Sequence, residues 1–334
     1  MLDVAIIGAG VAGLAAARRL RGSSLSVQIF EARDRTGGRA YSPELSGHPA
    51  DVGATWVWDS ERAIHALLKE LGVGTFPHFD AGQDTLDDTP LRRGRFPRGA
   101  VPERRISGGV QRIADALTAD APLTMGTAVH SLDPEQSSVR IGASDGVHHA
   151  KVVLAALPPS LVAPMLAASD PDASDLLSRV PVWMGDVAKV VATFSDRFWE
   201  RQGSSGRAVS QRGPMVEVHD MSGEGGTPAR LFGFVPRAAD GPDLEERVRA
   251  QLIRLFGPDA EPIGLHIHAW WSEAYTTEAD PKTEPRLFGH SALRAPFLDG
   301  TLHLVGCETS GISPGHLNGA AERADKVCGA LLRR

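Results

Sequence analysis

The sequence has little cysteine and no long apolar run. Its 334 residues include two cysteines, Cys307 and Cys328, which form no CxxC motif and belong to no cluster of metal-ligating residues. We therefore expect neither a disulfide framework nor a metal site, and a reducing cytoplasm is the expected location. No stretch reaches the roughly 18 apolar residues of a spanning helix, and no secretory signal precedes the first strand. The sequence predicts a cytoplasmic protein without a membrane segment.

Lysine is also scarce, so arginine carries almost all of the positive charge. The net charge of -6 provides no general basic surface, and neither nucleic acid nor an anionic membrane is expected as a partner. Hydrophobic and charged contents of 42% and 23% are ordinary for a folded chain, whose length suits one large domain or two interleaved ones. The lysines are Lys69, Lys151, Lys189, Lys282 and Lys326.

The N-terminal residues have the pattern strand, glycine turn, helix, strand. Residues 3–7 and 25–30 are apolar runs typical of buried strands, and 11–21 is rich in alanine and leucine, which favours a helix. The turn has the GxGxxG pattern: Gly8 permits a tight turn, Gly10 lets a pyrophosphate approach the backbone, and Gly13 lets helix and strand pack closely. Glu31 ends the second strand, where a carboxylate can accept hydrogen bonds from ribose hydroxyls. The pattern predicts a Rossmann-like dinucleotide fold.

Further elements follow from apolar periodicity, while residues 75–105 look irregular. Strands are expected within 123–157, at 187–194, within 207–236, at 263–271 and at 302–305. Helices are expected at 61–71, 109–117, 161–180, 243–256 and from 317 onward.

The segment after the second strand resembles a known family. Residues 31–39 read EARDRTGGR and residues 51–54 read DVGA, as in the flavin-containing amine oxidases, which include monoamine and polyamine oxidases and histone-lysine demethylases. The resemblance implies an α/β fold, with a Rossmann-like FAD-binding domain of the glutathione-reductase type interleaved with a smaller α+β substrate domain on a mixed or antiparallel sheet. The FAD-binding domain is expected at 1–76, 105–160 and 285–334, and the substrate domain at 77–104 and 161–284.

The resemblance also implies which residues contact FAD. In the family, the stretch matching 31–39 wraps the cofactor, the D-x-G motif approaches the isoalloxazine, a strand valine contacts the adenine, and a closing G-x-E lies near the ribityl chain. The expected contacts are Gly8, Gly10, Ala12, Gly13, Glu31, Ala32, Arg33, Gly38, Arg39, Gly53, Ala54, Thr55, Trp56, Val129, Trp270, Gly306, Cys307, Glu308, Gly315, His316 and Leu317.

Lys189 lies in the apolar strand 187–194, where a buried ammonium is costly unless it reaches water or a partner. Taken alone, it could be an edge-strand lysine that extends outward. The segment 185–199 (GDVAKVVATFSDRFW), however, resembles the family's G-x-x-x-K strand and its following Phe-Trp pair. In the family this lysine holds a water against flavin N5 and assists reoxidation, so the resemblance implies that Lys189 is catalytic.

Three departures from the family concern the substrate. His316 stands where an aromatic cage residue is usual, and neither the second aromatic nor the covalent-flavin cysteine is present near Ala279 and Asp280. FAD is therefore expected to bind non-covalently. His316 is a second catalytic candidate, as a substrate contact or redox-tuning group, unless it only begins a helix. The short segment 76–105 replaces a large insertion of the family, which implies a more open active site.

The leading hypothesis is an FAD-dependent oxidase that removes hydride from the α-carbon of a primary or secondary amine to flavin N5. The products would be an imine and, after reoxidation by oxygen, hydrogen peroxide; the partners would be a small amine and oxygen. One alternative is a renalase-like flavoprotein that oxidises dihydronicotinamide isomers. Another, of a different class, is a catalytically silent FAD-binding or partner-binding protein. The sequence does not indicate the oligomeric state.

Overall fold

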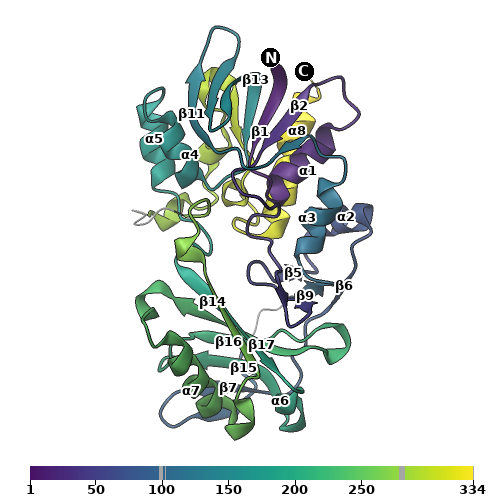
Figure 1. The fold of residues 1–334 in the computed structure, drawn as a ribbon, viewed down its shortest axis with the longest axis vertical. Helices are drawn as coiled ribbons and strands as arrows, with labels where there is room; N and C mark the ends of the chain where they lie inside the picture. Colours follow the sequence, from purple (N-terminus) through teal and green to yellow (C-terminus); the bar gives the residue numbers. More distant parts are fainter. Residues whose placement is uncertain (98–100, 102, 278–282, 334) are drawn as a thin grey trace.

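A computed structural model describes residues 1–97, 101, 103–277 and 283–333, and its core is built on two large sheets (Figure 1). Within these residues the first sheet has the strand order β10-β2-β1-β13-β12-β11, with β19 pairing to β13. β1 pairs in parallel with β2 and β13, whereas β11, β12 and β13 are antiparallel. The strands are β1 (Leu2–Ile7), β2 (Val27–Phe30), β10 (Leu123–Thr124), β11 (Val129–Pro134), β12 (Val139–Ala143), β13 (Gly146–Ala155) and β19 (Leu302–Leu304).

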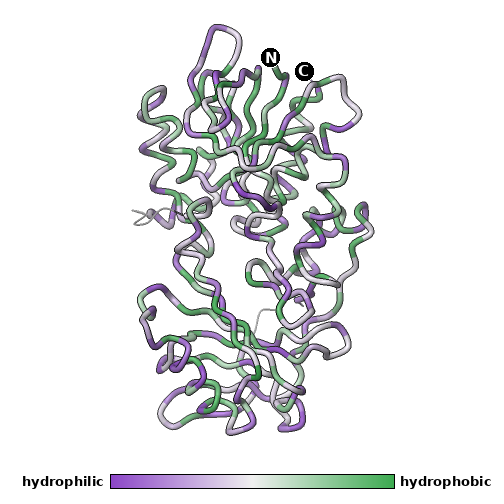
Figure 2. The backbone as a smooth tube through the Cα atoms, viewed as in Figure 1, coloured by the Kyte–Doolittle hydropathy of each residue, from purple (hydrophilic) through white to green (hydrophobic). Residues whose placement is uncertain are grey.

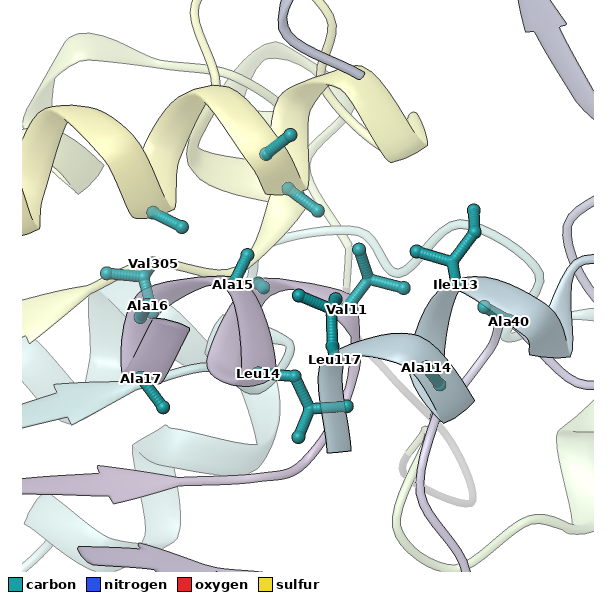
Figure 3. Close-up of a cluster of buried hydrophobic side chains, with 14 of the residues drawn as sticks. Val11, Leu14, Ala15, Ala16, Ala17, Ala40, Ile113, Ala114, Leu117 and Val305 are labelled. Atoms are coloured by element: carbon teal, nitrogen blue, oxygen red, sulfur yellow. The ribbon is translucent and has the colours of Figure 1, made fainter. Parts of the chain in front are cut away.

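Helices cover both faces of the first sheet, because successive residues of its buried strands point to opposite sides. Val4 and Ile6 of β1 belong to a core shared with the helices α1, α2, α3 and α8, part of which Figure 3 shows. Ala5 and Ile7 belong to a second core with α4 and α5. The helices are α1 (Val11–Leu20), α2 (Arg62–Leu71), α3 (Gln111–Thr118), α4 (Pro159–Leu166), α5 (Pro171–Ser178) and α8 (Leu317–Leu331).

The second large sheet has the order β18-β14-β17-β16-β15-β7-β8. On one face, Ala188 and Val190 of β14 pack with the helix α7. On the other face, Val191 packs with Ala50 and Val52 from the N-terminal part of the chain, so this face is turned toward the first sheet. The elements are β7 (Gln83–Asp87), β8 (Arg92–Gly94), β14 (Val187–Phe194), α6 (Phe198–Arg201), β15 (Ser204–Ser210), β16 (Glu217–Asp220), β17 (Ala229–Pro236), α7 (Leu244–Phe256) and β18 (Gly264–Ala269).

A small sheet, β5-β9-β6, lies between the two large ones (Figure 1). Its strands are β5 (Trp56–Trp58), β6 (Thr75–Pro77) and β9 (Glu103–Ile106), and a two-stranded hairpin joins β3 (Glu44–Leu45) to β4 (His48–Pro49). In Figure 2 the strands of the upper sheet are largely hydrophobic and the outer loops largely hydrophilic, as the packing of two cores requires.

The expected α/β fold with a Rossmann-like unit is confirmed, and two finer predictions are wrong. Residues 161–180 form two helices, not one, because the Asp170 side chain accepts a hydrogen bond from the Ala173 amide and Pro171 begins a new helix there. Residues 75–105 contain the short strands β6 to β9, whose polar sequences lack the alternation that marks a strand. The predicted domain boundaries stay a prediction. None of the described helices has both the length and the apolar character that crossing a membrane requires.

Candidate active site

A cavity of about 970 Å³ brings together segments from the whole length of the chain. Its wall includes the glycine turn after β1, the segments at 30–40 and 53–58, and the loop before α8. Val216, Glu217 and Phe234 add a contribution from the second sheet. Ligand sites commonly have this concave, largely apolar form, and this cavity is at the upper end of their usual size.

The glycine turn has the shape that a close phosphate contact needs. Gly8 has φ +98°, and Gly13 packs so closely that a Cβ atom would lie 2.0 Å from the Gly8 carbonyl oxygen. At Gly10, by contrast, a Cβ atom would meet only the Gly37 oxygen, at 3.9 Å, so the space over this residue is open to the cavity. Gly10 is the N-cap of α1, and no side chain caps this helix end. Its free amide groups can therefore bind the pyrophosphate of a dinucleotide.

Glu31 is buried at the end of β2 and is held by two backbone amides. Its Oε2 accepts from the Ala9 amide at 2.6 Å, and its Oε1 accepts from the Arg33 amide at 2.9 Å. The Arg33 side chain donates in turn to Glu273 at 2.9 Å. The carboxylate is therefore fixed beside the glycine turn, at the cavity wall, where ribose hydroxyls of the expected FAD would find an acceptor.

Arg39 and Glu308 form an ion pair at the wall. Nη1 of Arg39 lies 2.5 Å from Oε1 of Glu308, which is fully buried. Nη1 also donates to the Trp183 carbonyl at 2.9 Å, and Nη2 donates to Cys307 Sγ at 3.3 Å. Burial raises the pKa of the Cys307 thiol to about 12, so the thiol stays protonated and is a weak nucleophile.

Lys189 is fully buried and reaches the wall through the segment 53–55. Its Nζ donates to the Gly53 carbonyl at 3.0 Å and also to Thr55 Oγ1, and it lies 4.2 Å from the centre of the Phe232 ring. Burial lowers the pKa of Lys189 to about 7; nearby Asp51 opposes this shift and Arg105 adds to it. Gly53 and Thr55 line the cavity and Lys189 does not, so the lysine lies behind the wall and is hydrogen-bonded to it.

His316 is partly exposed in the wall and has two partners that the sequence analysis did not identify. Its Nδ1 lies 2.7 Å from Oε1 of Glu61, and its ring lies 4.7 Å from that of Trp58, centre to centre. Trp58 also lines the cavity. The aromatic residues at positions 56 and 58 were a sequence signal that could have identified Trp58 as a site residue. Nothing in the sequence links Glu61 to His316.

The cavity unites most of the predicted site residues. Gly13, Lys189, Trp270 and Glu308 lie outside its lining: Gly13 packs under the turn, and the Trp270 indole donates to the Val52 carbonyl at 2.7 Å behind Gly53. The lining includes Gly8, Gly10, Ala12, Glu31, Ala32, Arg33, Gly38, Arg39, Gly53, Ala54, Thr55, Trp56, Val129, Gly306, Cys307, Gly315, His316 and Leu317.

A further part of the wall, the loop before β14, was not predicted from the sequence. Trp183, Met184 and Asp186 line the cavity, and Met184 has φ +71°. Ala279 and Asp280, near which a second cage aromatic was sought, lie outside the described residues. Among the described residues, no three His, Cys, Asp or Glu side chains form a group that could hold a metal ion.

Comparisons with known proteins agree with this architecture. The family model for flavin-containing amine oxidoreductases matches residues 11–105 and 95–332. A putative flavin-containing monoamine oxidase, AofH, of Mycobacterium tuberculosis (strain H37Rv) is 26% identical over 446 aligned positions, covering 99% of this chain and 97% of that protein. A solved putrescine oxidase bound to putrescine has a TM-score of 0.86 at 21% identity, covering 100% of this chain and 99% of that one. Cyclohexylamine oxidase from Brevibacterium oxydans IH-35A gives 0.86 and 21%, covering 100% of both chains.

Proposed function

The chain belongs to the flavin-containing amine oxidoreductase family, and from that premise we propose that it oxidises a primary or secondary amine with oxygen as electron acceptor. As a family member it is an FAD-dependent oxidoreductase. When bound, FAD supplies the redox chemistry, which takes a hydride from the amine α-carbon and yields an imine and, with oxygen, hydrogen peroxide. The protein's own residues bind the cofactor, orient the amine and hold protons.

The observation that carries this proposal is the contact of Lys189 with the cavity wall. A fully buried ammonium is costly, and this one is held by the Gly53 carbonyl and the Thr55 hydroxyl. Because burial lowers the pKa of Lys189 to about 7, the amine gains or loses a proton near neutral pH. Thr55 lines the cavity, so its hydroxyl would connect Nζ to reacting groups bound there.

We further propose that FAD binds non-covalently along the glycine turn, Glu31 and Arg39. The open space over Gly10 and the free amides of α1 suit the pyrophosphate, and the fixed Glu31 carboxylate suits a ribose. Cys307 lines the cavity, but its protonated thiol is bonded to Arg39 and Glu308, which argues against a thioether to the flavin.

The substrate proposed is an apolar amine. Trp56, Trp58, Phe234 and Val216 give the cavity an apolar wall from β5 and the second sheet, on which a hydrocarbon group can pack. The relatives that share the fold include a putrescine oxidase and a cyclohexylamine oxidase. Cyclohexylamine and benzylamine are therefore the first amines to test, with putrescine as a polar comparison.

The test is aerobic turnover by the purified flavoprotein. Hydrogen peroxide and the carbonyl product should form in equal amounts with at least one of these amines. Consumption of dihydronicotinamide isomers without any amine turnover would overturn the proposal in favour of renalase-like chemistry. No turnover of either class, by protein that contains FAD, would favour a catalytically silent protein.

A further inference from the structure

His316 and Glu61 are held together at the ends of two packed helices. Glu61 precedes α2 and His316 precedes α8, and Nδ1 of the histidine lies 2.7 Å from Oε1 of the glutamate. Asn318 ties the same two ends, because its Oδ1 accepts from the Ala63 amide at 2.9 Å and the Ile64 amide at 3.1 Å. The His316–Glu61 pair is therefore built into the junction of the helices.

The hydrogen bonds determine which ring nitrogen can accept a proton. A carboxylate only accepts hydrogen bonds, so Glu61 accepts from the Trp58 amide at 3.1 Å through Oε2 and from the Nδ1–H of His316 through Oε1. In the neutral imidazole the lone pair then lies on Nε2, which has no hydrogen-bond partner among the described residues. His316 belongs to the lining of the cavity.

The carboxylates of the cavity wall can attract a cation into the cavity. Asp186 and Glu217 line the cavity and are exposed, and Glu217 lies 3.2 Å from Nε2 of His219. The two arginines of the lining are each paired with a carboxylate, Arg33 at 2.9 Å and Arg39 at 2.5 Å. An arriving ammonium therefore meets carboxylates whose charge is not cancelled by these arginines.

Arg62, next to Glu61, is exposed, and three other charged groups on the elements around the pair have partners of their own. On α2, Nε2 of His65 lies 3.0 Å from the Trp58 carbonyl oxygen. On β9, Arg104 lies 3.9 Å from Asp59. On α8, Glu322 is 2.5 Å from Lys326. Glu61 is thus the carboxylate that acts directly on His316.

We propose that His316 accepts a proton from an alkylammonium substrate in the cavity, with Glu61 as its positioning residue. The step rests on the proposed amine oxidation: one N–H bond of the ammonium breaks, a new N–H bond forms on Nε2, and the amine becomes neutral. The imidazolium is stabilised by Glu61, and the pair as a whole is then electrically neutral. His316 holds this proton while the amine is bound, and because its side chain is 42% exposed, the proton can pass to solvent once the oxidised product has left.

This step changes which form of the substrate the enzyme uses. An alkylamine with a pKa near that of lysine, about 10.4, is less than about 1% neutral at pH 8. A site with its own proton acceptor uses the abundant ammonium, whereas a site without one waits for the scarce free amine. A positioned proton acceptor typically contributes 10²–10⁴-fold, so for His316→Asn we expect kcat/KM to fall roughly 100-fold near pH 8. Because the variant depends on the free amine, its kcat/KM should rise about tenfold per pH unit. In the wild type kcat/KM should be nearly flat there.

A binding experiment without turnover measures how many protons are released to the buffer when the amine binds. The probe is 2-phenylpropan-2-amine, which has no α C–H bond and is not oxidised; its binding to the FAD-loaded protein is followed by calorimetry in two buffers of different ionisation enthalpy. The wild type should release almost no proton to the buffer, because His316 keeps it, and His316→Asn should bind more weakly and release about one. Release of one proton by the wild type, release of none by the variant, or no binding to the wild type would each overturn the proposal.

Two further variants separate this role from a structural one. His149→Asn breaks an exposed histidine–glutamate pair outside the cavity lining, 3.1 Å from Glu135, and should behave as the wild type in both measurements. Glu61→Gln should retain FAD and should change the pH below which kcat/KM falls. If that pH is the same as in the wild type, Glu61 has no part in the proposal. If the proton counts agree with these predictions but no amine is oxidised, the proposed function is wrong and the proton transfer is still supported.

Discussion

Nζ of Lys189 donates a hydrogen bond of 3.0 Å to the carbonyl oxygen of Gly53, a residue 136 positions earlier in the chain. This contact joins β14 of the second sheet to the cavity wall, and the Thr55 hydroxyl adds a second acceptor on the same segment. A strand lysine that could have extended into solvent is instead buried against the wall. The predictions about oxygen and about pH depend on this contact.

Lys189→Met should slow the reaction of the reduced flavin with oxygen by at least about tenfold, since positioned proton donors and acceptors typically contribute 10²–10⁴-fold. Reduction of the flavin by an amine should change less. The measurement is stopped-flow mixing of anaerobically reduced protein with oxygenated buffer. Lys151→Met is the matched control, because Lys151 is an exposed lysine paired with Asp3 at 2.8 Å. Equal reoxidation rates in Lys189→Met and wild type would exclude the proposed role.

The same lysine predicts a pH dependence of stability. Burial lowers the pKa of Lys189 from 10.5 to about 7, so between these values the unfolded chain binds a proton that the folded protein does not. The lysine therefore destabilises the fold most at or below about pH 7, and this effect fades as pH rises toward 10. The free energy of unfolding of the wild type, relative to Lys189→Met, should increase over this window. A difference that stays constant or falls would contradict the assignment.

Alanine substitutions at two glycines of the same turn should impair the protein for different reasons. Gly13→Ala places a Cβ atom 2.0 Å from the Gly8 oxygen and 3.1 Å from Ala156 Cβ, so it should destabilise the fold by about 1–3 kcal/mol or more. Gly10→Ala meets only the Gly37 oxygen at 3.9 Å, so the protein should fold and bind FAD at least about tenfold more weakly. Chemical unfolding and FAD titration separate the two effects. Wild-type FAD affinity in Gly10→Ala would show that the pyrophosphate lies elsewhere.

Removing one partner of the Arg39–Glu308 pair should be costly. Glu308 is fully buried, so Glu308→Gln leaves the guanidinium without its counter-charge and should lower the free energy of unfolding by about 3–5 kcal/mol. Asp133→Asn breaks the exposed pair with Arg140, at 3.2 Å, and should change it by about 0–1 kcal/mol. Urea unfolding of both variants tests the contrast. Similar small losses in the two proteins would mean that the buried pair is not structurally important.

The sequence predicted those parts of the site that lie close together in the chain. The turn from Gly8 to Gly13 and the acidic end of β2 at Glu31 follow from local steric and hydrogen-bonding rules, and the structure has them as expected. Successive side chains of a strand point to opposite faces, so Lys189 shares one face of 187–194 with Val187 and Val191, and residues 188–194 are all buried. What the pattern could not indicate is the partner of that face, because packing between distant segments leaves no local periodicity.

The contacts that the sequence missed join residues far apart in the chain. Glu61 and His316 are 255 positions apart, and neither residue type is unusual at a helix start. Arg39 donates to the carbonyl of Trp183, a backbone group that any residue would supply. Two of the short strands within 75–105 pair with strands outside that segment, β7 with β15 and β9 with β5, so their own sequences carry little signal.

The most direct test of amine oxidation is anaerobic reduction of the bound flavin. Purified protein containing FAD is mixed without oxygen with cyclohexylamine, benzylamine or putrescine, and the visible absorbance of the flavin is followed. We predict that at least one amine bleaches the flavin within seconds to minutes and that readmitted oxygen restores the yellow colour with release of hydrogen peroxide. Flavin that stays oxidised with every amine but is bleached by dihydronicotinamide isomers would contradict the account.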